Sequence, residues 1–254
     1  MHKQLNQKQA LKYNRQILLP GFDLEAQEAL LNASVLMIGV GGLGNSAAQY
    51  LVSSGIGALT LCDDDKVELS NLSRQTLFIE QDIGRKKAQA AIARLSDLNP
   101  DGRLQFHTRR FDDSELAAQI RAHDLVLDCT DNLSSRNQIN RHCVALGKPL
   151  VVGAAIRFEG QLFSYAPEHN APCYQCLSAL FTEPQQSCVE SGILTPVVAI
   201  VGAMQALEAI KLITGVGKAR PGRLQLFDGL SGEWRYMNVK RHALCPACGP
   251  SKQK

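Results

Sequence analysis

Two kinds of apolar segment alternate along the first 155 residues of the chain. Short runs rich in β-branched and other apolar residues occur at 34–40 (SVLMIGV), 58–62 (ALTLC), 104–108 (LQFHT), 124–130 (DLVLDCT) and 149–156 (PLVVGAAI). Between them, apolar residues recur at helical spacing, as Ala88, Ile92 and Leu95 do in segment 85–98. This alternation predicts right-handed βαβ units, and therefore a Rossmann-like, mainly parallel sheet with helices on both faces.

The ends of two of these helices can be predicted from their flanking residues. In the segment GNSAAQYLVSSG, Asn45 or Ser46 is a candidate N-cap, and Gly55 is a candidate stop. The segment SSRNQINRHCVALG, at 134–147, also ends in glycine and predicts another helix.

The pattern changes after residue 157. Three segments indicate antiparallel strands, namely GQLFSY, GRLQLFDG and EWRYMNV, and they surround a long apolar helix predicted at 196–214. We expect a single domain at 11–249, with a nucleotide-binding half at about 30–156, a second half at about 157–249 and an N-terminal arm at 1–10. Residues 167–191 show the least pattern and predict a loop excursion.

A glycine turn follows the first predicted strand, in VLMIGVGGLGNS. Gly39, Gly41 and Gly44 have the G-x-G-x-x-G spacing that lets the backbone approach a phosphate at a helix N-terminus. Asp63 ends the next strand, at the place of the acid that binds ribose hydroxyls. The turn predicts a nucleotide site, although glycine turns also serve plain packing and a nicotinamide dehydrogenase uses the same turn and acid.

Cations near this turn favour a nucleoside triphosphate. Arg74 lies in LSNLSRQ, and Lys86 and Lys87 lie in IGRKKAQ at the start of a predicted helix. Cleavage of a triphosphate needs Lys and Arg to stabilise charge on phosphate oxygens, whereas a dinucleotide needs little beyond the helix terminus. Each cation could instead be an ordinary surface residue.

Acidic and amide side chains follow another predicted strand, in VLDCTDN. Asp128, Asp131 and Asn132 lie at its carboxyl end, where open α/β sheets place ligand chemistry. A carboxylate beside phosphates is a natural Mg²⁺ ligand, and we expect Asp131 to have that role. Asp131 and Asn132 are also candidate helix caps, and the two roles can coexist.

Two Cys-x-x-Cys motifs offer four thiolates. Cys173 and Cys176 form the first, and Cys245 and Cys248 form the second. Four thiolates suit tetrahedral zinc and leave no open coordination position, so the spacing predicts a structural Zn²⁺ site that joins the loop excursion to the C-terminal region. A redox pair is the alternative for either motif.

The remaining cysteines divide into two groups. Cys62, Cys129 and Cys143 lie in predicted strands or on a helix face and are expected to be small core residues. Cys188 lies in the loop region, where it could be a reactive thiol or simply a free loop cysteine.

Composition narrows the function classes. The 254 residues are 45% hydrophobic, and their net charge of +3 is spread along the chain, which gives no electrostatic case for nucleic acid. The polar N-terminus lacks the apolar core of a signal peptide, so we expect a cytoplasmic protein. Because Glu208 and Lys211 lie inside the long apolar segment, we expect a buried helix there and no membrane partner.

As a set, the motifs resemble the MoeB/ThiF/HesA family of ubiquitin-activating-like adenylyltransferases. The resemblance rests on KYNRQILLPGF, GVGGLGNS, LSNLSRQTLF, DLVLDCTDN, GAAIRFEGQ, CYQCL, MQALEAIKLITG and CPACG, and it covers about residues 11–249. It implies a homodimer that uses ATP and Mg²⁺ to adenylylate the C-terminal Gly-Gly carboxylate of a small ubiquitin-like sulfur-carrier protein.

The resemblance also implies roles for individual residues. It assigns catalytic roles to Asp131, Arg15, Arg74 and Lys87, with Arg15 reaching the phosphates of the partner subunit. It assigns nucleotide binding to the glycine turn with Gly42, and to Asp63, Ser70, Asn71, Arg74, Lys87, Asp131 and Asn132. It assigns structural zinc to Cys173, Cys176, Cys245 and Cys248.

Two branches of the family share features with the chain. GAAIRFEGQ and CVESGILTP resemble the molybdopterin-synthase branch, whereas CDDDKVELSNL, LQLFDG and EWR resemble the thiazole-pathway branch, and Cys188 has a counterpart in both. We expect the carrier to be the small subunit of molybdopterin synthase, in molybdenum cofactor biosynthesis. The thiazole (thiamine) carrier, an NAD-dependent oxidoreductase and a non-catalytic zinc-stabilised binding module are the alternatives. Because the chain has no rhodanese segment, we expect a separate sulfur donor protein.

Overall fold

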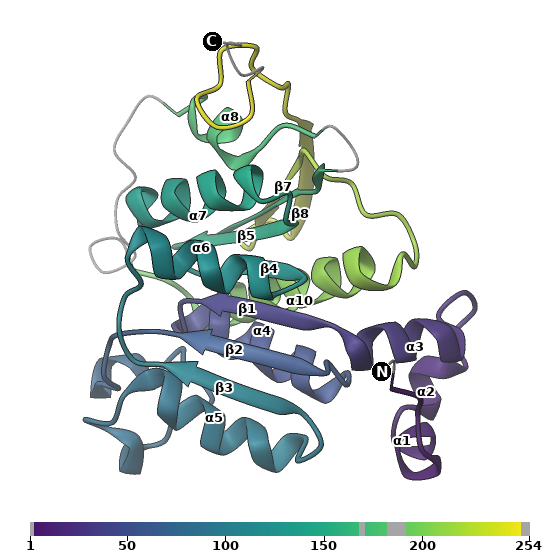
Figure 1. Cartoon of the computed structure of the whole chain (residues 1–254). Coiled ribbons are helices and arrows are strands. Elements are labelled where there is room, and N and C mark those ends of the chain that lie inside the picture. The colour runs from purple at the N-terminus through teal and green to yellow at the C-terminus, as the bar shows by residue number, and fades with distance from the viewer. Residues whose placement is uncertain (1–2, 168–170, 182–191, 250–254) are drawn as a thin grey trace.

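The computed structural model describes residues 3–167, 171–181 and 192–249 and contains a sheet of eight strands (Figure 1). Its strands are β1 (Ser34–Ile38), β2 (Ala58–Cys62), β3 (Arg103–His107), β4 (Leu125–Asp128), β5 (Leu150–Ile156), β6 (Glu159–Tyr165), β7 (Arg223–Asp228) and β8 (Glu233–Asn238). Their order across the sheet is β3-β2-β1-β4-β5-β6-β7-β8. The strands from β3 to β5 are parallel, and those from β5 to β8 are antiparallel. The predicted fold class is confirmed.

Helices cover both faces of this sheet. The longer ones are α4 (Gly42–Ser53), α5 (Lys87–Leu98), α6 (Asp113–Ala122), α7 (Leu133–Ala145) and α10 (Thr195–Thr214). Side chains of α4, α5 and α10 pack with Val35 and Met37 of β1, whereas those of α6 and α7 pack with Leu36 on the opposite face. Burial on both faces explains why the inner parallel strands β1, β2, β4 and β5 are mainly apolar, whereas the edge strand β3 is not.

The N-terminal region adds three helices beside the start of β1 (Figure 1). They are α1 (Gln7–Lys12), α2 (Asn14–Ile17) and α3 (Asp23–Asn32). Asn6 caps α1, because its side chain accepts a hydrogen bond from the backbone N–H of Gln9 at 2.9 Å. This region therefore has helical structure within and beyond the expected arm at 1–10.

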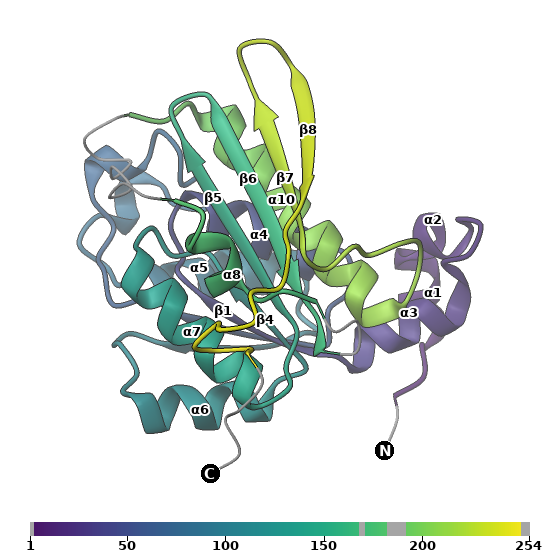
Figure 2. The same cartoon turned by 90° about the horizontal axis from the view of Figure 1, so that it is seen from above.

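Helix α10 is the one helix among the described residues that is long and apolar enough to cross a membrane. It packs against α4, β5 and β6 in the body of the protein (Figure 2). Its Glu208 is buried, accepts a hydrogen bond from the Ser164 hydroxyl at 2.9 Å and pairs with Lys211. The prediction of a buried helix is confirmed.

The prediction of the N-cap of α4 was wrong. Neither Asn45 nor Ser46 is the N-cap of α4, because the helix begins at Gly42 and Gly41 has the N-cap position. The Asn45 side chain instead lies inside the protein, donates to the Val40 carbonyl at 2.8 Å and accepts from the Leu77 N–H at 2.9 Å.

The predicted loop excursion at 167–191 contains a short helix, α8 (Tyr174–Ser178), which begins directly after Cys173. A helix of five residues is too short to show a helical repeat of apolar residues in the sequence. Residues 168–170 and 182–191 of the excursion lie outside the described residues.

Candidate nucleotide pocket and four-cysteine centre

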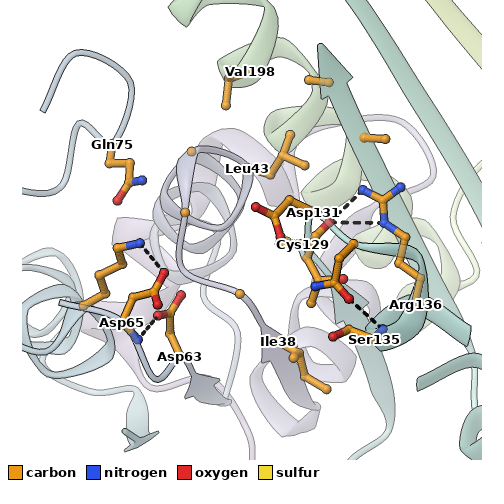
Figure 3. A pocket seen from close by; sticks show the side chains of 18 of the residues that line it. Ile38, Leu43, Asp63, Asp65, Gln75, Cys129, Asp131, Ser135, Arg136 and Val198 are labelled. Atoms are coloured by element: carbon orange, nitrogen blue, oxygen red, sulfur yellow. Dashed lines mark hydrogen bonds and ion pairs between the residues drawn. The ribbon is translucent and has the colours of Figure 1, made fainter. Parts of the chain in front are cut away.

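A cleft of about 990 Å³ lies at the carboxyl ends of the parallel strands (Figure 3). Most of the expected nucleotide-binding residues line it, namely Gly39, Gly41, Gly42, Asp63, Asn71, Arg74, Lys87, Asp131 and Asn132. Gly44, Ser70 and Lys86 are not part of the cleft lining. A cleft at this edge of the sheet is where open α/β folds bind ligands.

The glycines of the turn differ in how closely other atoms pack against them. Gly39 has a φ of +93°, and a Cβ there would lie 2.6 Å from the Cys129 carbonyl oxygen. A Cβ on Gly44 would lie 2.2 Å from the Gly39 carbonyl oxygen. At Gly41 the nearest atom to a Cβ would be the Gln75 amide nitrogen, at 4.0 Å. Gly39 and Gly44 therefore serve the turn itself, whereas Gly41 faces the cleft.

The N-terminus of α4 opens toward this space. No described side chain caps the helix, so backbone N–H groups of its first turn are available to an anion. The geometry suits the phosphates of a nucleotide.

Asp63 fixes the turn from the end of β2. One carboxylate oxygen accepts from the Val40 N–H at 2.7 Å, and the other accepts from the Asp65 N–H at 2.9 Å. Burial raises the pKa of Asp63, and these two N–H donors and Lys87 oppose that rise. Each carboxylate oxygen keeps a lone pair that can accept a hydrogen bond from a ribose hydroxyl.

Two of the expected cations reach the cleft. Lys87 is buried at the start of α5, with its ammonium 2.8 Å from a carboxylate oxygen of Asp65. Arg74 donates to the Ser70 carbonyl at 2.9 Å and is half-buried. Lys86 instead donates to the carbonyl of Asp64, and although Asp64 lines the cleft, Lys86 itself does not.

Asp131 lies across the glycine turn from Asp63 and Asp65 (Figure 3). It is exposed in the cleft, while the neighbouring Asn132 caps α7 by accepting from the Ser135 N–H at 2.9 Å. The cap interpretation is therefore confirmed for Asn132. One exposed carboxylate beside the glycine turn fits Mg²⁺, which prefers one or two carboxylates together with phosphate oxygens and water.

Arg15 lies outside the cleft. It is an exposed residue of α2, which lies among the helices beside the start of β1 (Figure 1), and it is not part of the cleft lining. A single copy of the chain does not bring Arg15 to this cleft.

Two buried polar residues of the cleft, Gln75 and Arg136, were not predicted from the sequence. Gln75 follows Arg74, and its side-chain oxygen is buried without a hydrogen-bond partner among the described residues. Arg136 lies on the same side of α7 as the buried Asn140 and Cys143. Two polar residues on the core-facing side of a predicted helix were the available signal for Arg136.

The four cysteines of the Cys-x-x-Cys motifs come together in one buried cluster. Their sulfur atoms all lie within 4.8 Å of one another. The Cys173 and Cys245 sulfurs are 3.6 Å apart, and the Cys176 and Cys248 sulfurs are 3.4 Å apart, so the close pairs join different motifs. Four sulfurs about 3.8 Å apart surround a tetrahedral ion with metal–sulfur bonds of about 2.3 Å, so the cluster suits a bound metal.

Neighbouring N–H groups favour the thiolate form that a metal ion binds, whereas burial opposes it. The Asn140 amide donates to the Cys173 sulfur at 3.5 Å, and the His242 N–H donates to the Cys176 sulfur at 3.4 Å. Burial raises the pKa of Cys173, and it raises the pKa of Cys176 to about 11. Burial opposes deprotonation of Cys245 too, but N–H donors of the second motif lower its pKa to about 7. None of the seven described cysteines forms a disulfide.

The other described cysteines are core residues, as predicted. Cys62, Cys129 and Cys143 are buried, and burial raises the pKa of each thiol, to about 12 for Cys62. Cys188 lies outside the described residues.

Known proteins resemble this chain in sequence over nearly its whole length. A model described as the ThiF family matches residues 13–247. The chain is 47% identical to the molybdopterin-synthase adenylyltransferase of Escherichia coli strain K12, over 97% of this chain and 99% of that protein. It is 45% identical to the sulfur carrier protein ThiS adenylyltransferase of the same strain, over 97% of this chain and 98% of that protein.

A solved structure has a similar fold. The crystal structure of E. coli MccB with ATP matches with a TM-score of 0.76 and 25% identity, over 89% of this chain and 69% of that chain.

Proposed function

The chain belongs to the ThiF family, and we propose on that basis that it is an adenylyltransferase that transfers AMP from ATP to the C-terminal carboxylate of a small sulfur-carrier protein. The observation that carries the proposal is that one cleft is lined by the glycine turn, by the cations Arg74 and Lys87 and by the exposed Asp131. A dinucleotide oxidoreductase would leave Arg74 and Lys87 without a task.

The proposed reaction requires alignment and charge stabilisation. The terminal carboxylate of the carrier is ionised at neutral pH, so it attacks the α-phosphorus without a protein base, and pyrophosphate leaves. The first-turn N–H groups of α4, together with Arg74 and Lys87, stabilise the charge that develops on the phosphate oxygens. Asp131 would hold Mg²⁺, which when bound neutralises phosphate charge as a Lewis acid.

We assign ribose binding to Asp63 and phosphate binding to Asn71, Arg74 and Lys87. The position of each at the cleft supports the assignment. We assign structural Zn²⁺ to the four cysteines, since four thiolates leave no position for substrate.

The position of Arg15 supports a homodimer. Because Arg15 is exposed on α2 and away from the cleft of its own chain, a phosphate-binding role requires it to enter the cleft of a second copy. We propose that the active enzyme is such a homodimer in the cytoplasm. A separate donor protein then supplies sulfur to the adenylylated carrier.

The small subunit of molybdopterin synthase is the carrier we propose. The chain has 47% identity to the molybdopterin-synthase adenylyltransferase, and its Arg157 segment agrees with that branch. The 45% identity to the ThiS adenylyltransferase makes the thiazole-pathway carrier the second candidate.

Intact-mass spectrometry tests this assignment. Each carrier is incubated with the protein, ATP and Mg²⁺, and a mass increase corresponding to AMP is sought. An adduct on the molybdopterin-type carrier alone supports the proposal, whereas an adduct on the thiazole-type carrier alone assigns the other pathway. The absence of an adduct on both carriers, with zinc bound and the dimer intact, contradicts the proposed function.

A further inference from the structure

Thr130, the residue before Asp131, is held through all of its polar groups. Its N–H and its hydroxyl both donate to one carboxylate oxygen of Asp128, at 2.9 and 2.7 Å. Its carbonyl accepts from two nitrogens of Arg136, Nη2 at 2.7 Å and Nε at 3.2 Å. Since Asp128 is 0% exposed and Arg136 is 4% exposed, little water competes for these bonds. The backbone that enters Asp131 is therefore fixed from two sides.

Arg136 also contacts groups beyond this loop. Its Nη1 lies 3.5 Å from the Tyr174 hydroxyl, and its Nη2 lies 3.4 Å from the Gly153 carbonyl. Tyr174 is the residue next to Cys173 and begins α8. The guanidinium thus bridges the loop that carries Asp131 and the segment that carries the first Cys-x-x-Cys motif.

Asn140 makes a second link between α7 and the cysteines. It lies one turn after Arg136, on the same side of α7. Its side-chain oxygen accepts from the Tyr174 N–H at 2.9 Å, and its nitrogen donates to the Cys173 sulfur at 3.5 Å. One side of α7 therefore contacts both the four-cysteine centre and the loop before Asp131.

Building on the proposed function, we propose that Arg136 is a positioning residue that holds Asp131 in place for Mg²⁺-dependent adenylylation, and that Tyr174 and Asn140 anchor Arg136 to the four-cysteine centre. The planar guanidinium is needed because two of its N–H groups bind one carbonyl while a third reaches Tyr174. A lysine keeps the positive charge near Asp128 but lacks this fork.

The first test is Arg136→Lys, with Arg109→Lys as the matched control. Arg109 also binds through two guanidinium nitrogens, but it does so on the surface, where each nitrogen donates to one carboxylate oxygen of Glu115. For Arg136→Lys we expect the Mg²⁺ concentration for half-maximal AMP transfer to rise by about tenfold or more, and kcat to fall by about ten- to a hundredfold. The ATP affinity without Mg²⁺ should stay within about twofold, because Arg136 acts through Asp131. A variant with an unchanged Mg²⁺ requirement overturns the proposal.

A second variant keeps the test decisive if Arg136→Lys does not fold. Tyr174→Phe removes only the hydroxyl, and the Asn140 contacts to the Tyr174 backbone and to Cys173 remain. With its zinc content equal to that of the wild type, this variant should raise the Mg²⁺ requirement in the same direction, by about two- to fivefold. An unchanged requirement at full metal content contradicts the link to the four-cysteine centre.

Nucleotide binding separates this inference from the proposed function. Calorimetry measures the affinity for ATP with and without Mg²⁺ and needs no carrier protein. We expect Mg²⁺ to increase the ATP affinity strongly in the wild type and in Arg109→Lys, and to increase it less in Arg136→Lys. If no carrier receives AMP but this difference persists, the proposed function fails and the positioning role stands. A wild type in which Mg²⁺ leaves the ATP affinity unchanged contradicts the positioning role itself.

Discussion

The parallel and antiparallel halves of the sheet hold their functional groups by different means. In the parallel half, the carboxyl ends of neighbouring strands place Asp63 and the residues after β4 at one edge, where backbone N–H groups orient Asp63. In the antiparallel half, the cysteines of each close sulfur pair are 72 residues apart. The parallel strand order therefore brings the pocket residues together. In the second half, residues far apart in the sequence meet in the four-cysteine cluster, which a bound metal can stabilise.

Burial differs between the middle of the sheet and its edges, because the edge strand β3 of the parallel half has no buried residue. Every residue of β4 is buried, and every residue of β8 is exposed. Much of the apolar packing of the parallel half comes from α4, α5 and α10, while the four cysteines belong to the core on the other face of the sheet. The difference predicts that substitutions in the pocket mainly change catalysis, and that substitutions in the cysteine cluster mainly change stability.

The largest expected effect is that of Asp131→Ala on catalysis. Because Asp131 is exposed and lies in the cleft, its loss should lower kcat by about a hundredfold to a thousandfold while the unfolding temperature stays within about 2 °C. AMP transfer to a carrier and thermal unfolding are measured on the same sample. Near-wild-type turnover would remove Asp131 from the mechanism.

The next effect is the loss of the metal from the cysteine cluster. Cys248→Ser, or removal of the metal by a chelator, should lower the free energy of unfolding by about 3 kcal/mol or more, which is about 6–12 °C in unfolding temperature. Metal analysis should give one zinc per chain before treatment. An unfolding temperature that does not change on chelation would mean that the cluster closes without a metal.

A matched pair of glycine substitutions comes third. Gly44→Ala should cost about 2 kcal/mol, because the new Cβ collides with the Gly39 carbonyl. Gly41→Ala should change the free energy of unfolding by less than about 0.5 kcal/mol but weaken ATP binding by about tenfold, because its Cβ enters the cleft. Denaturant unfolding and ATP titration distinguish the two, and equal effects of both substitutions on stability would refute this division of roles.

The smallest effect concerns a cysteine outside the cluster. Cys143→Ala removes a buried sulfur from the core between α7 and the sheet and should cost about 1 kcal/mol. Zinc content and AMP transfer should remain unchanged, in contrast to Cys248→Ser. Loss of zinc from Cys143→Ala would show that Cys143 also contributes to the metal site.

Much of this architecture could be predicted from the sequence because its signals are local. The runs at β1, β2, β4 and β5 are apolar since both faces of the sheet are covered, and the predicted helix at 196–214 differs from α10 by one residue. The glycine turn, Asp63 and Asp131 could be identified since strand ends and turns fix their positions.

The features that were missed depend on tertiary contacts. Asn45 was predicted as a cap, but a buried carbonyl and the Leu77 N–H offer its side chain better partners inside the protein. The role of Arg136 depends on Tyr174, which is 38 residues away along the chain. Local sequence patterns do not predict such long-range contacts. The one available signal was the presence of polar residues on the buried side of α7, which indicates buried polar contacts there.

Carrier-dependent exchange of labelled pyrophosphate into ATP tests the central claim most directly. Adenylylation of a carboxylate is reversible before sulfur transfer, so the protein should catalyse exchange with Mg²⁺ and an intact Gly-Gly carrier. Exchange should be lost with a carrier that lacks the terminal glycine, and with Asp131→Ala. Exchange at the same rate without any carrier, or no exchange with either type of carrier, would contradict the account of this cleft as the site that activates a carrier carboxylate.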